Sequence, residues 1–124
     1  MERNILKITI YHNPRCSKSR QTLALLQENS PEENIKQIEY LKSPPSLQEL
    51  KAILTMLNMS PLELIRKNEE EYKMLNINNS NYSDSELLKL MVENPKLIER
   101  PIVVIDDKVA VIGRPPECVL EFFN

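Results

Sequence analysis

A strand-like pattern runs directly into a helical one in the first thirty residues, and this junction constrains the fold more than any other feature. Leu6, Ile8 and Ile10 alternate with more polar residues, and a period of two predicts a strand with one buried face. The run from Ser17 to about Asn29 contains neither Gly nor Pro and predicts a helix that stops at Ser30-Pro31. A strand followed at once by a helix indicates an α/β fold.

The middle of the chain carries repeated helix-start signals. A short second strand, Ile38 to Leu41, ends at the breaker Ser43-Pro44-Pro45. Three capping boxes follow, in which a Ser and a Glu three positions later satisfy free amides of the first helical turn. The pairs are Ser46 with Glu49, Ser60 with Glu63, and Ser83 with Glu86. We therefore predict a helical block over residues 46–94, with a loop in the Asn-rich stretch from Asn76 to Asn81.

The C-terminal quarter predicts a hairpin and a last helix. Apolar residues 102–105 and 109–112 flank Asp106-Asp107-Lys108 as two strands would. Pro115 and Pro116 suit the first turn of a helix whose apolar stripe contains Cys118, so Cys118 is predicted to be a buried core thiol. The element order predicts one α/β domain over residues 1–124: a thioredoxin/glutaredoxin-like four-stranded mixed sheet with a helical insertion at about 46–94.

Composition and charge exclude several classes of protein. A chain of 124 residues with 41% hydrophobic content is the size of one domain, and a net charge of −2 argues against a nucleic-acid binder. No apolar stretch approaches the ~20 residues of a membrane span, and the N-terminal residues lack the apolar core of a signal peptide. We therefore expect a cytoplasmic protein with reduced thiols that binds neither nucleic acid nor membrane, and we expect a monomer.

Cys16 lies where the first strand has ended and the helix begins. The surrounding segment, from Arg3 to Gln27, contains five cations and no carboxylate. A helix N-terminus and nearby cations both lower the pKa of a thiol. The alternatives are a solvated basic face and an inert, buried cysteine. Charge alone leaves the basic face and a thiolate site open, and the polar and basic neighbours of Cys16 favour a reactive thiolate over the buried cysteine.

His12, the only histidine, precedes Cys16 by four residues. It either turns toward the thiol or simply closes the strand. One histidine beside one cysteine offers too few ligands for a structural zinc site, and no CxxC motif occurs, so we expect no metal. The single glycine, Gly113, excludes glycine-rich phosphate-binding loops.

Four motifs spread over nearly the whole chain resemble the glutaredoxin-coupled arsenate reductase (ArsC) family: HNPRCSKSR, LIRKN, ERPIVV and GRPPE. The resemblance implies that Cys16 and His12 are catalytic, and that three arginines bind the oxyanion, namely Arg66, Arg100 and Arg114. It also implies a cis peptide before Pro101. Guanidinium groups match tetrahedral oxyanions, although each arginine alone is equally consistent with an ordinary helix-end or surface cation.

The resemblance also implies a mechanism. The Cys16 thiolate attacks arsenic(V) with loss of water, glutathione attacks the adduct, and glutaredoxin reduces the mixed species as arsenite is released. Glutathione is then a co-substrate, glutaredoxin is a protein partner, and no cofactor is bound. A single cysteine suffices, which agrees with the absence of a CxxC motif. Arsenate reductases of the low-molecular-weight phosphatase type are disfavoured, because Thr22 stands where their CX5R loop has arginine.

Two departures from the best-known arsenate reductases indicate a sister branch of the family. Ser17-Lys18-Ser19 replaces their Gly-Thr-Ser, and Gly113 precedes Arg114 where they often have cysteine. Two alternative functions follow. An Spx-like, RNA polymerase-binding regulator typically carries CxxC where this chain has Cys16 and Ser19, and uses a glycine that is absent from this helical block. The other alternative is a glutathione-dependent thiol oxidoreductase with a different substrate.

Overall fold

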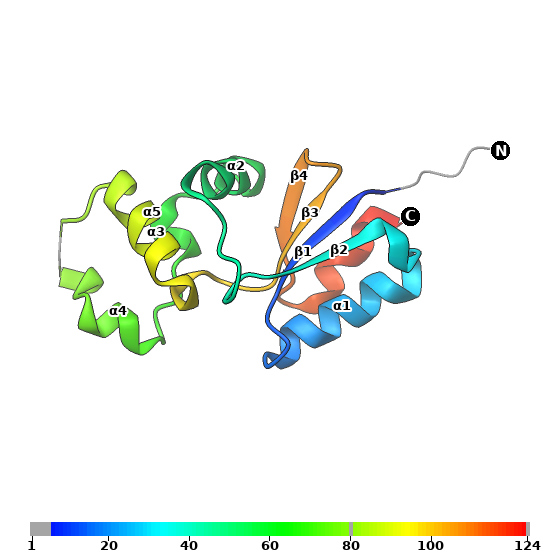
Figure 1. The fold of residues 1–124 in the computed structure, drawn as a ribbon, viewed down its shortest axis with the longest axis horizontal. Coiled ribbons are helices and arrows are strands. Elements are labelled where there is room, and N and C mark those ends of the chain that lie inside the picture. Colours follow the sequence, from blue (N-terminus) through cyan, green and yellow to red (C-terminus); the bar gives the residue numbers. More distant parts are fainter. Residues whose placement is uncertain (1–5, 80, 124) are drawn as a thin grey trace. The chain divides into compact units, whose positions relative to one another are not determined.

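The computed structural model describes residues 6–79 and 81–123 and contains a four-stranded mixed sheet (Figure 1). Its strand order is β2-β1-β3-β4. The strands are β1 (Ile8–His12), β2 (Ile35–Glu39), β3 (Ile102–Ile105) and β4 (Val109–Ile112). β1 pairs parallel with β2 and antiparallel with β3, and β3 pairs antiparallel with β4. The predicted fold class is therefore confirmed.

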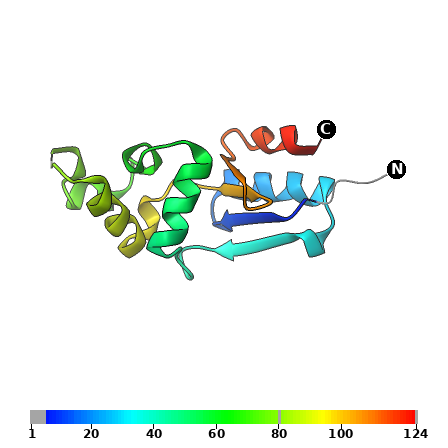
Figure 2. The ribbon, with the colours of Figure 1, turned by 90° about the horizontal axis from the view of Figure 1, so that it is seen from above.

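Helix α1 (Ser17–Asn29) and the 3-10 helix η4 (Pro116–Phe123) pack against each other and against the sheet (Figure 2). Their side chains join those of three strands in one buried cluster. Its members are Ile8, Ile10, Leu26, Ile35, Val103, Ile105 and Val119. A further 3-10 turn, η1 (Glu32–Asn34), links α1 to β2. The predicted order of strand, helix and strand at the start of the chain is confirmed.

Two strands differ in detail from the sequence-based expectation. The first, β1, is covered on both faces, because Tyr11 and His12 are buried as well as Ile8 and Ile10. β2 starts at Ile35, which pairs with Ile8, so the predicted span Ile38 to Leu41 is wrong by about three residues. The cause is that β2 is an edge strand whose exposed residues are polar, and its sequence therefore lacks a clear apolar run.

The β3–β4 hairpin is confirmed, with a turn that the sequence pattern did not specify. Asp106 and Asp107 both have left-handed backbone conformations, with φ of 55° and 54°. Aspartate is among the few non-glycine residues that tolerate this region. The Lys7 amide donates to Asp106 Oδ1 at 2.8 Å, and Lys7 Nζ pairs with Asp107 Oδ2 at 2.7 Å. These contacts attach the turn to the start of β1.

Cys118 is half-buried, so the prediction of a fully buried core thiol is wrong. The last helical segment is a 3-10 helix with three residues per turn, whereas the prediction assumed the 3.6-residue period of an α-helix. The change of period moves Cys118 partly off the apolar stripe, although the adjacent Val119 is fully buried.

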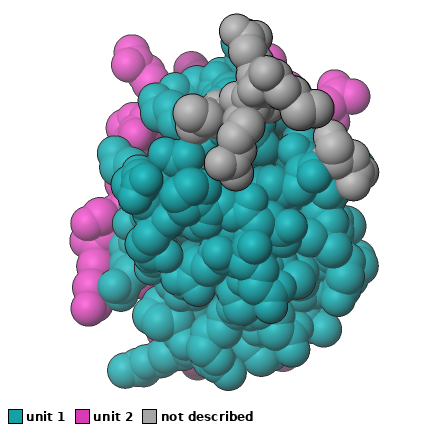
Figure 3. Space-filling view, turned by 90° about the vertical axis from the view of Figure 1, so that its right-hand side faces the viewer, with its two compact units in different colours: residues 1–40, 100–124 teal, residues 41–99 magenta. Residues whose placement is uncertain are grey.

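Clustering of contacts divides the chain into two compact units, coloured separately in Figure 3. One unit comprises residues 1–40 and 100–124 and contains the sheet; the other comprises residues 41–99 and is built from helices. The helical unit lies in the sequence between β2 and β3. The assignment of the whole chain to a single domain stays a prediction.

The helical unit begins its main helices at the three predicted capping boxes. Each box is complete: the Ser side chain accepts from the Glu amide, and the Glu side chain accepts from the Ser amide. The helices that they start are α2 (Leu47–Leu57), α3 (Pro61–Leu64) and α5 (Asp84–Glu93). α2 and α5 pack together through buried side chains that include Leu50, Ile53, Leu87 and Met91.

Three short segments of this unit were not predicted as separate elements, although the first lies within the predicted helical block. α4 (Glu70–Met74) starts at Glu69 without a side-chain cap, so the sequence lacks the usual start signal. The 3-10 turn η2 (Ile77–Asn79) falls in the Asn-rich stretch that we expected to be a loop, of which Ser80 lies outside the described residues. Another 3-10 turn, η3 (Pro95–Leu97), follows α5. Among residues 6–79 and 81–123, no helix has both the length and the apolarity that a bilayer crossing requires.

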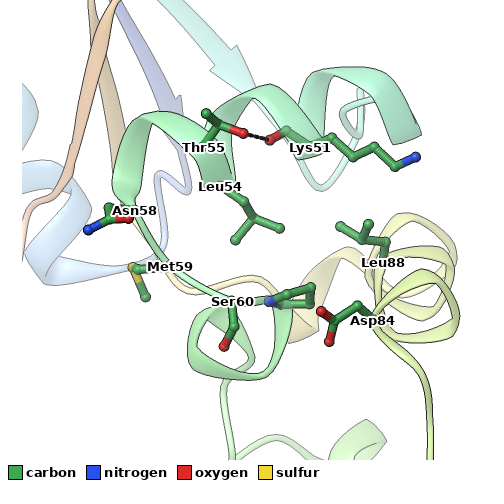
Figure 4. A pocket seen from close by; sticks show the side chains of 9 residues that line it. Lys51, Leu54, Thr55, Asn58, Met59, Ser60, Asp84 and Leu88 are labelled. Carbon is green, nitrogen blue, oxygen red and sulfur yellow. Dashed lines mark hydrogen bonds between the residues drawn. The ribbon is translucent and has the colours of Figure 1, made fainter.

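A hollow of about 630 Å³ lies within the helical unit (Figure 4). Leu54 and Leu88 contribute apolar side chains to its wall, and Lys51, Asn58 and Asp84 contribute polar ones. No residue of the predicted oxyanion site lines it.

Candidate active site

Cys16 is the N-cap residue of α1, as the sequence predicts. Two hydrogen bonds hold the turn that leads from β1 into the helix. The Cys16 amide donates to the Asn13 carbonyl at 3.0 Å, and the Arg15 amide donates to Asn13 Oδ1 at 3.0 Å. The Cys16 carbonyl accepts the first helical bond, from the Arg20 amide at 3.0 Å. The thiol is half-buried, in the place where free amides of the first turn gather.

The surroundings of Cys16 lower its pKa below that of an ordinary thiol. Burial acts in the opposite direction, since it disfavours the charged form. It is outweighed by hydrogen bonding from the Ser19 amide, by the hydrogen bond and charge of the Arg100 guanidinium, and by the Lys18 amide. The sulfur is thus biased toward the thiolate, which is the nucleophilic form.

Two of the predicted arginines lie with Cys16 in the sheet-containing unit. Arg114 Nη2 donates to Cys16 Sγ at 3.6 Å, and Arg114 Nε donates to the Arg100 carbonyl at 2.7 Å. The contact with the sulfur is long, and Arg100 has the larger influence on the thiol pKa. Cis peptides precede both Pro101, as expected from the resemblance, and Pro115, which was not predicted. One thiol and two guanidinium groups are therefore gathered at one place.

Gly113 allows the segment that bears Arg114 to approach α1 closely. A Cβ atom added at Gly113 would collide with Thr22 and would lie 2.9 Å from Pro101 Cγ. Thr22 is fully buried, and the Gly113 amide donates to the Pro101 carbonyl at 2.9 Å. In the sequence, Gly113 serves only to exclude glycine-rich phosphate loops, because a steric role of this kind has no motif of its own.

His12 is the last residue of β1 and is 5% exposed. Among the described residues its ring forms a hydrogen bond with Ser19 and not with Cys16. The distance from His12 Nδ1 to Ser19 Oγ is 2.6 Å, and Ser19 Oγ also accepts from the Asn13 amide at 3.0 Å. Burial lowers the pKa of His12, Glu39 opposes this, and Arg20 reinforces it. A neutral imidazole is therefore favoured.

Ser19 is a site residue that the sequence analysis missed. Its side chain is fully buried, its amide lowers the pKa of Cys16, and its hydroxyl bonds to His12. A signal was present, because Ser19 is the third residue of a helix whose N-cap is Cys16, and the amide at that position points toward the N-cap side chain. Ser19 links His12 to the loop that carries the thiol.

Arg66 belongs to the helical unit, where Arg66 Nη1 pairs with Glu99 Oε1 at 2.7 Å. The backbone there is fixed by the bridge between Ile65 and Ile98, and the Arg66 amide donates to the Leu97 carbonyl at 2.7 Å. Arg66 Nε is buried and has no hydrogen-bond partner among the described residues. The participation of Arg66 in an oxyanion site stays a prediction.

The four sequence motifs led us to expect three arginines around a reactive cysteine, and the structure gathers two of them, Arg100 and Arg114, with Cys16 at a helix N-terminus. The model of the ArsC family matches residues 11–122, which is nearly the whole chain. The chain belongs to the ArsC family. The membership of a particular sister branch within the ArsC family stays a prediction.

Individual members of the ArsC family are closely similar to this chain. An arsenate reductase of Haemophilus influenzae is 48% identical over 94% of this chain and 98% of its own length. The Escherichia coli K12 protein YfgD is 52% identical over 93% of this chain and 95% of its own length. The solved structure of an arsenate reductase from Vibrio cholerae has a TM-score of 0.86 and 48% identity, covering 95% of this chain and 98% of that one. These matches share the thioredoxin-like α/β fold.

Proposed function

We propose that this protein is an arsenate reductase that uses the Cys16 thiolate, with glutathione as co-substrate and glutaredoxin as the final reductant. The single observation that carries the proposal is the contact of the Cys16 sulfur with two guanidinium groups, those of Arg114, at 3.6 Å, and of Arg100. The family membership and the relatives named arsenate reductase add support.

The proposed reaction balances with one thiol from the protein and one from glutathione. Arsenic(V) gains two electrons as arsenate becomes arsenite and one oxygen leaves as water. The two thiols supply these electrons when their sulfurs join as a mixed disulfide between Cys16 and glutathione. Glutaredoxin then reduces that disulfide and restores the Cys16 thiol, so no second cysteine of this chain is needed.

The arginines have distinct proposed roles. Arg100 and Arg114 neutralise the charge of the bound oxyanion, since planar guanidinium groups donate pairs of hydrogen bonds to such ligands. Arg66 has the same role by resemblance to the family. His12 acts through Ser19 on the thiol loop, as a positioning residue rather than as a metal ligand.

The occupancy of position 19 favours the enzyme over an Spx-like regulator. A CxxC redox switch needs a second thiol at this position, where the chain has the buried Ser19. Its hydroxyl is already committed to His12 and to the Asn13 amide. The site therefore supports single-thiol chemistry.

A coupled assay tests the proposal. The purified protein is given arsenate, glutathione and glutaredoxin, and arsenite is measured as each component is omitted in turn. The proposal predicts that arsenite formation requires all three. Arsenite formation that persists without glutaredoxin or glutathione would remove that reductant from the scheme, and the absence of any arsenite would reject arsenate as substrate.

A further inference from the structure

The cations near Cys16 differ in how they are used within the protein. Arg20 Nη1 donates to the Pro14 carbonyl at 2.9 Å, and Arg114 contacts both the Arg100 carbonyl and the Cys16 sulfur. Arg15 and Lys18 are different: both are exposed, and within residues 6–79 and 81–123 neither side chain forms an ion pair or a hydrogen bond. They have no visible role in the fold.

The backbone that bears Arg15 and Lys18 is the same backbone that holds the thiol. Arg15 directly precedes Cys16, and its amide is fixed by Asn13 Oδ1 at 3.0 Å. Lys18 lies in the first turn of α1, and its amide helps to lower the pKa of Cys16. The side chains of Arg15 and Lys18 therefore leave the backbone one residue before and two residues after Cys16.

No negative charge within this segment compensates these cations. From Asn13 to Gln27 the chain contains three basic residues and no carboxylate. A segment that carries basic residues and no carboxylate attracts anions from solution and steers them toward an adjacent site. A solvated basic face without a function would have the same composition. The two interpretations differ because only an anion-binding segment speeds the reaction of Cys16 with an anionic reactant.

The proposed reaction has two anionic reactants, and the arginines account for one of them. Arg100 and Arg114 are the groups assigned to the oxyanion. Glutathione, the other reactant, is a tripeptide with two carboxylates, and its sulfur must reach Cys16. Its carboxylates then lie within a tripeptide's length of Cys16 Sγ, in the neighbourhood where Arg15 and Lys18 supply exposed, unpaired cations.

We propose that Arg15 and Lys18 bind the carboxylates of the small anionic thiol that reacts at Cys16, and so make the protein selective for glutathione over neutral thiols. This inference rests on the proposed function for the identity of the thiol. It assigns the two residues to co-substrate specificity, separately from the oxyanion-binding arginines.

The test is a reaction that needs no arsenate. In a Cys118→Ser background, the Cys16 thiolate attacks oxidised glutathione, forming the Cys16–glutathione disulfide and releasing one glutathione thiolate. The rate is measured by mass spectrometry for the parent protein and for Arg15→Ala/Lys18→Ala. Bis(2-hydroxyethyl) disulfide, which is uncharged, reports the intrinsic reactivity of Cys16 in each protein.

A matched control removes the same charge elsewhere in the sheet-containing unit. Lys36→Ala/Lys108→Ala also deletes two exposed cations. Lys36 pairs with Thr9 in the register of β1 and β2, and Lys108 lies in the β3–β4 turn beside the start of β1. Both positions are toward the end of the sheet opposite to His12, from which the thiol loop departs.

The proposal predicts that Arg15→Ala/Lys18→Ala slows the reaction with oxidised glutathione by about three- to tenfold, the size expected for two exposed charge pairs. The neutral disulfide should react at the parent rate, because Lys18 acts on the thiol pKa through its backbone amide, which the substitution retains, and 1 M salt should erase most of the difference. An equal loss with both disulfides, or an equal loss in the Lys36/Lys108 control, would overturn the proposal. Because arsenate is absent, failure here is distinct from failure of the arsenate assay.

Discussion

The reactivity of Cys16 depends on the residues that favour its thiolate. The lowered pKa places half-maximal reactivity at a lower pH than for an ordinary thiol, since only the thiolate reacts. Arg100 contributes to this lowering by both its hydrogen bond and its charge. We expect Arg100→Ala to shift the pH profile of Cys16 alkylation by iodoacetamide to higher pH.

The alkylation experiment has a control variant, Lys36→Ala. Lys36→Ala removes an exposed cation from β2 and should leave the profile of Cys16 where it is. The modified residue is identified by mass spectrometry, so that Cys118 is not counted. An unchanged profile in Arg100→Ala would show that Arg100 does not stabilise the thiolate.

Ser19 has a structural role that a single substitution exposes. Ser19→Ala removes the acceptor of the buried Asn13 amide and the partner of His12 Nδ1. Leaving such buried groups without a partner typically costs about 1–3 kcal/mol in the free energy of unfolding. Urea denaturation measures this loss. Ser17→Ala, at an exposed position of the same helix, should stay within about 0.5 kcal/mol of the parent, and similar losses in both variants would contradict the account.

At the scale of elements, the sequence predicted the features that depend on neighbouring residues. It did not predict the features that depend on tertiary packing. The capping boxes at Ser46, Ser60 and Ser83 were predicted because both partners lie within four consecutive residues. The bounds of β2 were missed because its pairing with β1 fixes them, and its own residues are mostly polar. The half-burial of Cys118 was missed because the period of the last helix is set by packing.

The first capping box makes a quantitative prediction. Ser46→Ala removes the side chain that accepts from the Glu49 amide at 3.1 Å, at the start of α2. Loss of such a cap costs about 1 kcal/mol in the free energy of unfolding. Ser43→Ala, an exposed position just before this helix, is the matched control and should be nearly neutral. Thermal or urea unfolding that gives equal values for the two variants would show that the box contributes nothing.

At the scale of the whole molecule, the sequence predicted the sheet, the inserted helices and the position of the thiol at a helix start. The resemblance to the ArsC family assigned the chemistry to residues that include Cys16, Arg100 and Arg114, and the structure brings these three together in one unit. The sequence did not reveal Ser19, because a serine near a cysteine has no distinctive pattern until the His12 bond is seen. Arg66 lies in the other unit, so its role in the reaction has to be tested by kinetics.

Kinetics of an arginine variant test whether the helical unit contributes to the reaction. We expect Arg66→Ala to lower kcat/KM for arsenate tenfold or more, the loss of a charge-assisted contact of about 1.5–3 kcal/mol. Lys67→Ala removes the adjacent, exposed cation and should retain the parent value. Unfolding midpoints of both variants identify any loss that is due to misfolding. Equal kcat/KM in the parent and Arg66→Ala would exclude Arg66 from the oxyanion site.

The central claim is that one thiol, Cys16, reduces arsenate. The most direct measurement is arsenite formation with glutathione and glutaredoxin by the parent, by Cys16→Ser and by Cys118→Ser. The account predicts that Cys16→Ser forms no arsenite above the protein-free background and that Cys118→Ser keeps the parent rate, because the half-buried Cys118 has no part in the reaction. Full activity in Cys16→Ser, or loss of activity in Cys118→Ser, would contradict it.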